Sequence, residues 1–328
     1  MPEEFVIPEE ERVSKAARDD AYFDLVRRLS HQSVVKHYDA YADIEWNDPE
    51  FQIDHDDPRW ELEADDVLGA TAWYRLQPAG IRSRIGLRML TNFMKIGVIF
   101  EYVLKRGLLD FASRLPTGSP EFRYCYHETI EEAQHSLMFQ EFINRTGFEV
   151  PPLNKLESMG ADFVAKYART FPELFFVFVL AGEDPIDYVQ RQMLRKNREE
   201  IHPLLRRIMQ IHVTEEARHM SFARHSLRNR VPRLSAFRRA RLAFSVPLIL
   251  GLMGRIMMEA SPQIAREYHI PSEVVNAAYG KNPIHRKRIH EASTKLFGLC
   301  RELGLVNRWS VRVWRMMRIE PGAAAVTF

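Results

Sequence analysis

The hydrophobic and polar positions of this chain repeat with the period of an α-helix over most of its length. From about residue 67 onward, long apolar-periodic segments alternate with short breaks, and β-branched alternation and Asn-Gly or Asp-Gly turns are nearly absent. The pattern predicts long helices over about 83–114, 120–146, 172–198 and 203–230. The chain is therefore predicted to be all-α.

The breaks between these helices predict how they pair. The first two helices are separated by Leu-Pro-Thr-Gly-Ser-Pro at 115–120, and the last two by a short segment that ends at Pro203, which suits a first helical turn. Such short connections favour antiparallel neighbours. Between the two pairs, a crossover through Pro151-Pro152 and a further helical stretch lead to Pro172.

The rest of the chain divides by composition. Residues 1–66 combine a helical stretch (about 10–29) with an irregular Asp/Pro-rich segment, and they carry 20 Asp/Glu against 7 Lys/Arg. Residues 281–320 carry 10 Lys/Arg against 3 Asp/Glu. We interpret 1–66 as an acidic arm that packs on the core, 67–265 as a helical bundle, and 266–328 as a basic helical extension of the same domain.

Two short runs inside the predicted helices repeat the pattern Glu-x-x-His, at Glu132–His135 and at Glu216–His219. The spacing of three places both side chains on one helix face. One further glutamate precedes each run in strongly apolar sequence, Glu101 and Glu183, where an unpaired charge would be costly to bury. Two Glu-x-x-His pairs and two single glutamates from four helices are the ligand set of a ferritin-like di-iron or di-manganese site, so we expect a ferritin-like four-helix bundle core with additional flanking helices.

The positions of these residues along their helices support one shared site. Glu101 lies 16 residues before Thr117 and Glu132 lies 15 after it, while Glu183 lies 17 before Glu200 and Glu216 lies 16 after it. At the rise of an α-helix, all four lie about 24 Å from the connection of their hairpin. Two hairpins built alike are therefore expected to place their glutamates at one level.

A third histidine extends the second motif. His212 precedes Glu216 by four residues and His219 by seven, so the three side chains share one stripe of the helix. We predict that His212 is an additional ligand, which makes four glutamates and three histidines. This oxygen-rich set suits iron or manganese, whereas structural zinc is more usually held by Cys and His.

Composition limits the classes of protein and the cellular compartments that the sequence fits. The two cysteines, Cys125 and Cys300, are far apart, which excludes a disulfide framework and a cysteine-ligated iron–sulfur cluster and fits a reducing cytoplasm. The N-terminus lacks the features of a signal peptide. A formal net charge of +2 gives no signal for nucleic acid. The apolar run 242–254 is interpreted as a buried helix; its preceding arginines leave contact with a membrane surface as the alternative.

The seven-ligand arrangement, with a third histidine one turn before the last Glu-x-x-His, resembles the p-aminobenzoate N-oxygenases and related arylamine oxygenases of aureothin and chloramphenicol biosynthesis, over roughly residues 85–225. The resemblance implies a cytoplasmic di-iron enzyme, commonly a homodimer, that uses dioxygen and electrons from an external redox partner to oxidise an arylamine towards the nitro level. It assigns the ligand roles to Glu101, Glu132, His135, Glu183, His212, Glu216 and His219. It also implies a peroxo di-iron(III) oxidant that attacks the substrate nitrogen, with Glu132 and Glu216 as bridges.

Other functions share the same ligand set. A di-iron hydroxylase or desaturase would act on an acyl or other apolar small molecule. A ferroxidase or iron-storage protein would assemble into a shell, and a chain of 328 residues is long for such a subunit. A ribonucleotide reductase-like subunit would carry an organic radical. The sequence favours the oxygenase and leaves its substrate open.

Overall fold

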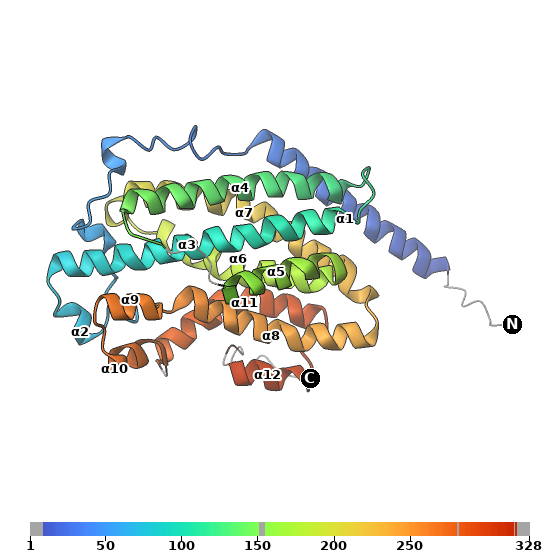
Figure 1. The fold of residues 1–328 in the computed structure, drawn as a ribbon. Helices are drawn as coiled ribbons and strands as arrows, with labels where there is room; N and C mark the ends of the chain where they lie inside the picture. Colours follow the sequence, from blue (N-terminus) through green and yellow to red (C-terminus); the bar gives the residue numbers. More distant parts are fainter. Residues whose placement is uncertain (1–8, 151–154, 281, 318, 320–328) are drawn as a thin grey trace.

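The computed structural model describes residues 9–150, 155–280, 282–317 and 319, and within these ranges the regular structure is entirely helical (Figure 1). The all-α prediction is confirmed. The predicted crossover at Pro151-Pro152 lies outside the described residues. One segment of the described chain, Ala236–Glu267, is long and apolar enough to cross a membrane, and half of it is buried in the protein.

Four long helices form the bundle. They are α3 (Ala79–Ala112), α4 (Pro120–Thr146), α6 (Pro172–Leu194) and α7 (Pro203–Arg230). In sequence order they pair as predicted, α3 with α4 and α6 with α7. Figure 1 shows α3 and α4 running side by side along the length of the molecule. The predicted boundaries hold to within four residues at each end.

Local chemistry explains where these helices begin and end. α4, α6 and α7 each start with a proline in the first turn, where the missing N–H costs no hydrogen bond. The Ser119 side chain also accepts a hydrogen bond from the amide of Phe122, which caps α4. α4 ends at Gly147, whose φ of 67° is a left-handed conformation that glycine adopts without strain.

The remaining helices surround the bundle. They are α1 (Glu9–Val35), α2 (Ala72–Arg75), α5 (Lys155–Thr170), α8 (Ala236–Met258), α9 (Pro262–Glu267), α10 (Ser272–Val275), α11 (Pro283–Glu302) and α12 (Ser310–Met317). α5 packs on α3 and α6, and α8 and α11 pack on α6. α12 contacts α8 on the side away from the bundle centre. The flanking helices expected from the sequence are therefore present.

The N-terminal residues pack along α4 and α7. α1 continues to Val35, six residues beyond the predicted end of the helical stretch, and the Tyr22 hydroxyl donates to Glu121 Oε1 at 2.7 Å. Residues 36–71, which we call the arm segment, contain only short 3-10 turns, as at Pro49–Phe51 and Pro58–Trp60. Aspartate side chains cap both turns, which agrees with the irregular structure predicted here.

A glycine allows α3 and α6 to approach closely beside the candidate site. Gly182 immediately precedes Glu183, and a Cβ at this position would lie 2.1 Å from the ring of Phe100, which immediately precedes Glu101. Only a residue without a side chain fits there. The contact therefore fixes the distance between the two helices that carry the single glutamates.

We predict that Gly182→Ala lowers the free energy of unfolding by about 1–3 kcal/mol, because the added methyl group overpacks this contact. Gly160→Ala is the matched control, since Gly160 is exposed in α5 with no atom within 4 Å of an added Cβ. In an exposed helix interior alanine is favoured over glycine, so the control is expected to unfold at the same or a higher temperature. Thermal unfolding of both variants tests the difference; equal stabilities would contradict it.

Candidate metal centre

The seven side chains predicted as ligands all lie in the interior of the bundle. Each is at most 1% exposed, and they are Glu101, Glu132, His135, Glu183, His212, Glu216 and His219. α3 and α6 each supply one glutamate, α4 supplies one Glu-x-x-His pair, and α7 supplies the other pair and the third histidine. The level inferred from residue counting is therefore shared by side chains from all four helices.

Six of the seven converge closely. His135 Nδ1 lies 3.0 Å from Glu132 Oε2 and 3.3 Å from Glu216 Oε1. His219 Nδ1 lies 3.1 Å from both Glu132 Oε1 and Glu216 Oε1. His212 Nε2 is 3.6 Å from Glu101 Oε1. The ligand atoms form two overlapping groups that could each hold a metal ion, and the two groups share His135 and Glu216.

Glu183 lies outside both groups but inside the same electrostatic environment. Both of its carboxylate oxygens are buried without a hydrogen-bond partner. Burial raises the pKa of Glu183, and the nearby charges of Glu216 and Glu132 raise it further. A buried carboxylate with no partner is costly, and a cation in the space between these acids would remove that cost.

Three residues outside the predicted set orient the imidazoles. The Nε2–H of His135 (α4) donates to Glu215 Oε2 (α7) at 3.0 Å, and the Nε2–H of His219 (α7) donates to Glu131 Oε2 (α4) at 2.7 Å. The third ring is held at its Nδ1, which donates to Gln190 Oε1 at 3.0 Å. In each case the opposite ring nitrogen faces the carboxylate cluster, as a metal-binding histidine requires.

Glu131 of α4 and Glu215 of α7 form reciprocal contacts between these two helices. Both motifs read Glu-Glu-x-x-His, and the first glutamate of each contacts the histidine of the other helix. Arg218 donates to Glu131 Oε1 at 2.7 Å and lies 3.6 Å from Glu215, so it joins the two partners. The doubled glutamate was the sequence signal for these positions, but its first members were not predicted.

The arm segment closes one side of this network. The amide of Tyr38 donates to Glu215 Oε1 at 3.0 Å, and the amide of Ala40 donates to Gln134 Oε1 at 2.9 Å. Gln134 in turn donates to Asp39. The arm segment packs against His135, Met138 and Ile211 here and leaves no space that a water molecule could enter.

The pKa shifts describe how the metal-free site holds protons. Burial raises the pKa of Glu101, and neighbouring carboxylates raise it further. Burial alone would lower the pKa of His135 and His219, but hydrogen bonds and charges from the surrounding glutamates outweigh it and raise both well above the usual value. Burial and the charge of His135 lower the pKa of His212 to about 4, so this ring is neutral at pH 7.

Two further ionisable side chains, Glu128 and Lys105, lie near the cluster. Glu128, one turn before Glu132 on α4, is 1% exposed rather than solvated, and its Oε2 has no hydrogen-bond partner. Burial raises its pKa well above the usual range. Lys105 on α3 donates to the backbone carbonyl of Glu132 at 3.2 Å and to Ser136.

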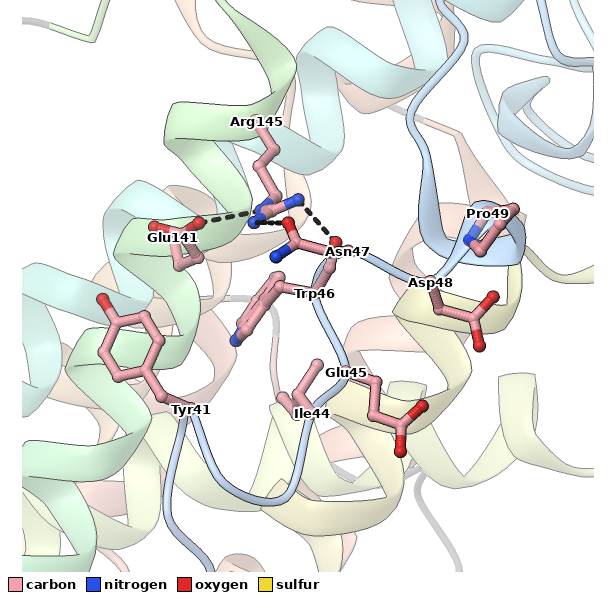
Figure 2. Close-up of a pocket in the computed structure, with 9 residues that line it drawn as sticks. All are labelled: Tyr41, Ile44, Glu45, Trp46, Asn47, Asp48, Pro49, Glu141 and Arg145. Carbon is pink, nitrogen blue, oxygen red and sulfur yellow. Dashed lines mark hydrogen bonds and ion pairs between the residues drawn. The ribbon is translucent and has the colours of Figure 1, made fainter.

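A larger hollow on the surface is separate from this centre. A pocket of about 650 Å³ lies between the arm segment and the C-terminal half of α4 (Figure 2). Arg145 crosses its wall and donates to Glu141 and to the backbone of Trp46. Glu141 is nine residues beyond Glu132, about 13 Å along the helix axis, so this pocket does not reach the buried carboxylates.

Four antiparallel-paired helices that bury a mixed carboxylate and imidazole cluster define the class of ferritin-like dinuclear metal proteins. Comparison with known proteins gives the family. The model of the family described as p-aminobenzoate N-oxygenase AurF matches residues 19–304, and this chain belongs to that family.

The relatives found among curated proteins are themselves uncharacterized. The chain is 38% identical over 304 residues to the uncharacterized protein MT0908 of Mycobacterium tuberculosis (strain CDC 1551 / Oshkosh), which covers 93% of this chain and 89% of the relative. It is 37% identical, with the same coverage, to the uncharacterized proteins Mb0909 of Mycobacterium bovis and Rv0885 of M. tuberculosis strain H37Rv. No solved structure gives a significant match.

We predict that Glu131→Ala weakens metal binding by about 10–100-fold, because His219 loses the carboxylate that orients its ring. Glu121→Ala is the control, since Glu121 is also a buried, paired carboxylate of α4 but contacts Tyr22 and Arg230 instead of a histidine of the cluster. Competition with a chelator of known affinity measures the change. Equal weakening in both variants would show that the effect is general destabilisation.

We also predict that metal affinity increases with pH. Glu101, Glu183, His135 and His219 have raised pKa values and hold protons in the metal-free protein, and a metal must displace these protons. Each displaced proton strengthens binding about tenfold per pH unit below the pKa of its group. Anaerobic calorimetry with Fe²⁺ at several pH values, in buffers of different ionisation enthalpy, measures the proton release; a pH-independent affinity would contradict the expectation.

Proposed function

We propose that this protein is a dioxygen-dependent non-haem di-iron oxygenase that adds oxygen to the nitrogen of an arylamine-like substrate. The observation that carries the proposal is the convergence of three buried glutamates and three buried histidines from α3, α4 and α7, with the buried Glu183 of α6 in the same electrostatic environment. Membership of the N-oxygenase family supports the reaction type. Glu101, Glu132, His135, Glu183, His212, Glu216 and His219 are the proposed ligands.

The residues present fit two divalent cations. With the imidazoles neutral, four carboxylates carry four negative charges, which two divalent ions balance. Oxygens of all four ligand glutamates are buried without a hydrogen-bond partner (Glu101 Oε2, Glu132 Oε1, both oxygens of Glu183, and Glu216 Oε2). Carboxylate and imidazole donors suit iron, with manganese as the alternative. When bound, a di-iron centre supplies redox chemistry with dioxygen.

The chain itself supplies orientation and a dry environment. Glu215, Glu131 and Gln190 each hold one imidazole, so the nitrogen facing the cluster is free of a proton when metal is bound. Apolar side chains on neighbouring turns, including Phe100, Phe139 and Phe178, keep water away from the ligands. A low-dielectric surrounding strengthens the electrostatic interactions inside the site.

The same apolar surroundings favour a second candidate, hydroxylation or desaturation of an acyl or other apolar substrate. The ring of Phe139 lies 5.2 Å from that of His212, and Phe100 packs against Phe178 at 5.0 Å beside Glu101. An arylamine and an acyl chain would both suit aromatic neighbours. A ferroxidase role is weaker, because no observation on this chain points to shell assembly.

We extend the proposal to the cellular location, the oligomeric state and the electron supply of the enzyme. A cytoplasmic homodimer that receives electrons from a redox partner accords with the family resemblance and with two buried, unpaired cysteines, Cys125 and Cys300. Each part is separately measurable, by sedimentation and by reconstitution with candidate electron donors.

Metal analysis of aerobically purified protein, combined with a substrate screen under ¹⁸O₂, tests the proposal. We expect two iron atoms per chain and an ¹⁸O-labelled N-oxygenated product from an aminobenzoate-like amine. Labelled products from acyl compounds alone would reject N-oxygenation in favour of the second candidate. Particles of many subunits that accumulate iron would reject both.

We predict that Glu132→Ala loses metal from at least one position and loses all oxygenation activity, because Glu132 lies against both His135 and His219. Iron content per chain and product formation measure the two losses. Glu141→Ala, on the same helix but outside the cluster, serves as control and is expected to keep both. Two metals per chain in Glu132→Ala would contradict the ligand assignment.

A further inference from the structure

Helix α8 has two faces with different environments. Its inner face is buried in the main hydrophobic core through Leu242, Val246, Leu250, Met253 and Met257. Its outer face carries five exposed apolar side chains, which we call the α8 stripe: Phe237 (77% exposed), Phe244 (42%), Leu248 (46%), Leu252 (57%) and Ile256 (44%). Figure 1 shows α8 on the side of the molecule opposite α4, with α12 lying beyond part of it.

The α8 stripe is continuous along the helix. Its members are seven, four, four and four residues apart, spacings that return to one side of an α-helix. The stripe extends over about 28 Å at the rise of an α-helix. Exposed apolar patches of this length on a soluble domain mark an interaction site.

Arginines outnumber acids along the stripe, where Arg255 lies near Glu259 and Arg238 lies near Glu173. The α8 sequence contains Arg238, Arg239, Arg241 and Arg255, with no Asp or Glu between Ser235 and Met258. Arg241 and Arg255 lie on the stripe side of the helix; the Arg255 side chain is 73% exposed and lies 3.9 Å from Glu259, the residue that follows α8. The surface is therefore both apolar and positively charged.

Helix α5 extends the same surface. Arg241 donates to the Tyr167 hydroxyl at 2.7 Å, and Tyr167 contacts the ring of Phe163 at 4.7 Å. Phe163 and Met159, one turn apart on α5, are 59% and 67% exposed. Lys166 on the same helix is also exposed. Two neighbouring helices thus present apolar side chains with cations beside them, and the one acid next to Phe163, Asp162, is paired with Arg106.

We propose that the α8 stripe, with Met159 and Phe163 of α5, docks on an anionic lipid bilayer, and that α8 lies in the plane of the interface. An amphipathic helix with apolar side chains on one face and basic residues beside them is the usual form of such an anchor. α8 does not span the bilayer, because its inner face is part of the protein core.

The basic residues beside the α8 stripe favour an anionic bilayer over a second copy of the chain as the partner of this surface. An antiparallel twofold contact centred on the stripe would place Arg241 of each copy near Arg255 of the other, at two points about 21 Å apart. Like charges brought together in an apolar interface oppose association. Anionic headgroups pair with the same arginines, each contributing about 1 kcal/mol near the surface, which is about fivefold in affinity.

Sedimentation of the full-length purified protein with lipid vesicles tests the proposal. We expect binding to vesicles of phosphatidylcholine mixed with phosphatidylglycerol, little binding to pure phosphatidylcholine, and weaker binding as salt is added. Leu252→Asp is expected to lower the partition coefficient at least about tenfold, the value of one leucine withdrawn from the interface.

Ile130→Asp is the matched control, because Ile130 on α4 is also 57% exposed but lies outside the docking surface. It is expected to bind vesicles like the unchanged protein, with both variants folded by circular dichroism. Absence of binding to the anionic vesicles, or equal binding to both kinds, would overturn the proposal. A dimer seen by sedimentation velocity that Leu252→Asp abolishes and Ile130→Asp retains would also overturn it, since a second copy would then cover the stripe.

Discussion

The cost of burying acids at the centre of a helical bundle governs the rest of this structure. Glu101, Glu132, Glu183 and Glu216 are shielded from water, and several of their oxygens have no hydrogen-bond partner in the part of the chain that the structure describes. Protons and charged imidazoles relieve part of that cost in the metal-free chain, because they neutralise or face the carboxylates. Cations relieve it more completely. Metal loading is therefore expected to be coupled to the stability of the whole bundle.

Because the buried acids must lie close enough to share cations, several contacts fix the positions of the four bundle helices near the cluster. Gly182 sets the separation of α3 and α6, while the crossed contacts of Glu131 and Glu215 hold α4 against α7. The arm segment adds the amide of Tyr38 to the same network. Misplacement of any one helix would move a ligand away from the others, so these contacts act on the geometry of the cluster although none of them belongs to the proposed ligand set.

Helix boundaries and cluster membership could be predicted from sequence because both depend on local signals. Prolines at 120, 172 and 203 mark first turns, and nearly equal residue counts from each connection predict that the four glutamates lie at one level. The crossed partners could not be predicted, since knowing that Glu131 meets His219 requires knowing which faces of α4 and α7 meet. Glu128 illustrates the same limit: it lies one turn before Glu132, but its burial depends on the approach of α7, whose Glu216 and His219 act on its carboxyl group.

The proposed metal centre and the proposed docking surface lie on opposite faces of the helices that form them. The candidate metal centre is built from the inner faces of α3, α4, α6 and α7. The buried face of α8 packs against α6 and so supports the position of that helix. The α8 stripe lies on the outer face, where side chains contribute little to the packing of the bundle and were free to become apolar without loss of stability. The proposed docking on a bilayer accounts for five large exposed apolar side chains beside arginines, which do not belong to the hydrophobic core. An interface on this side would bring the enzyme to a region where apolar amines and acyl compounds are both concentrated, which relates the docking surface to either class of substrate considered for the centre.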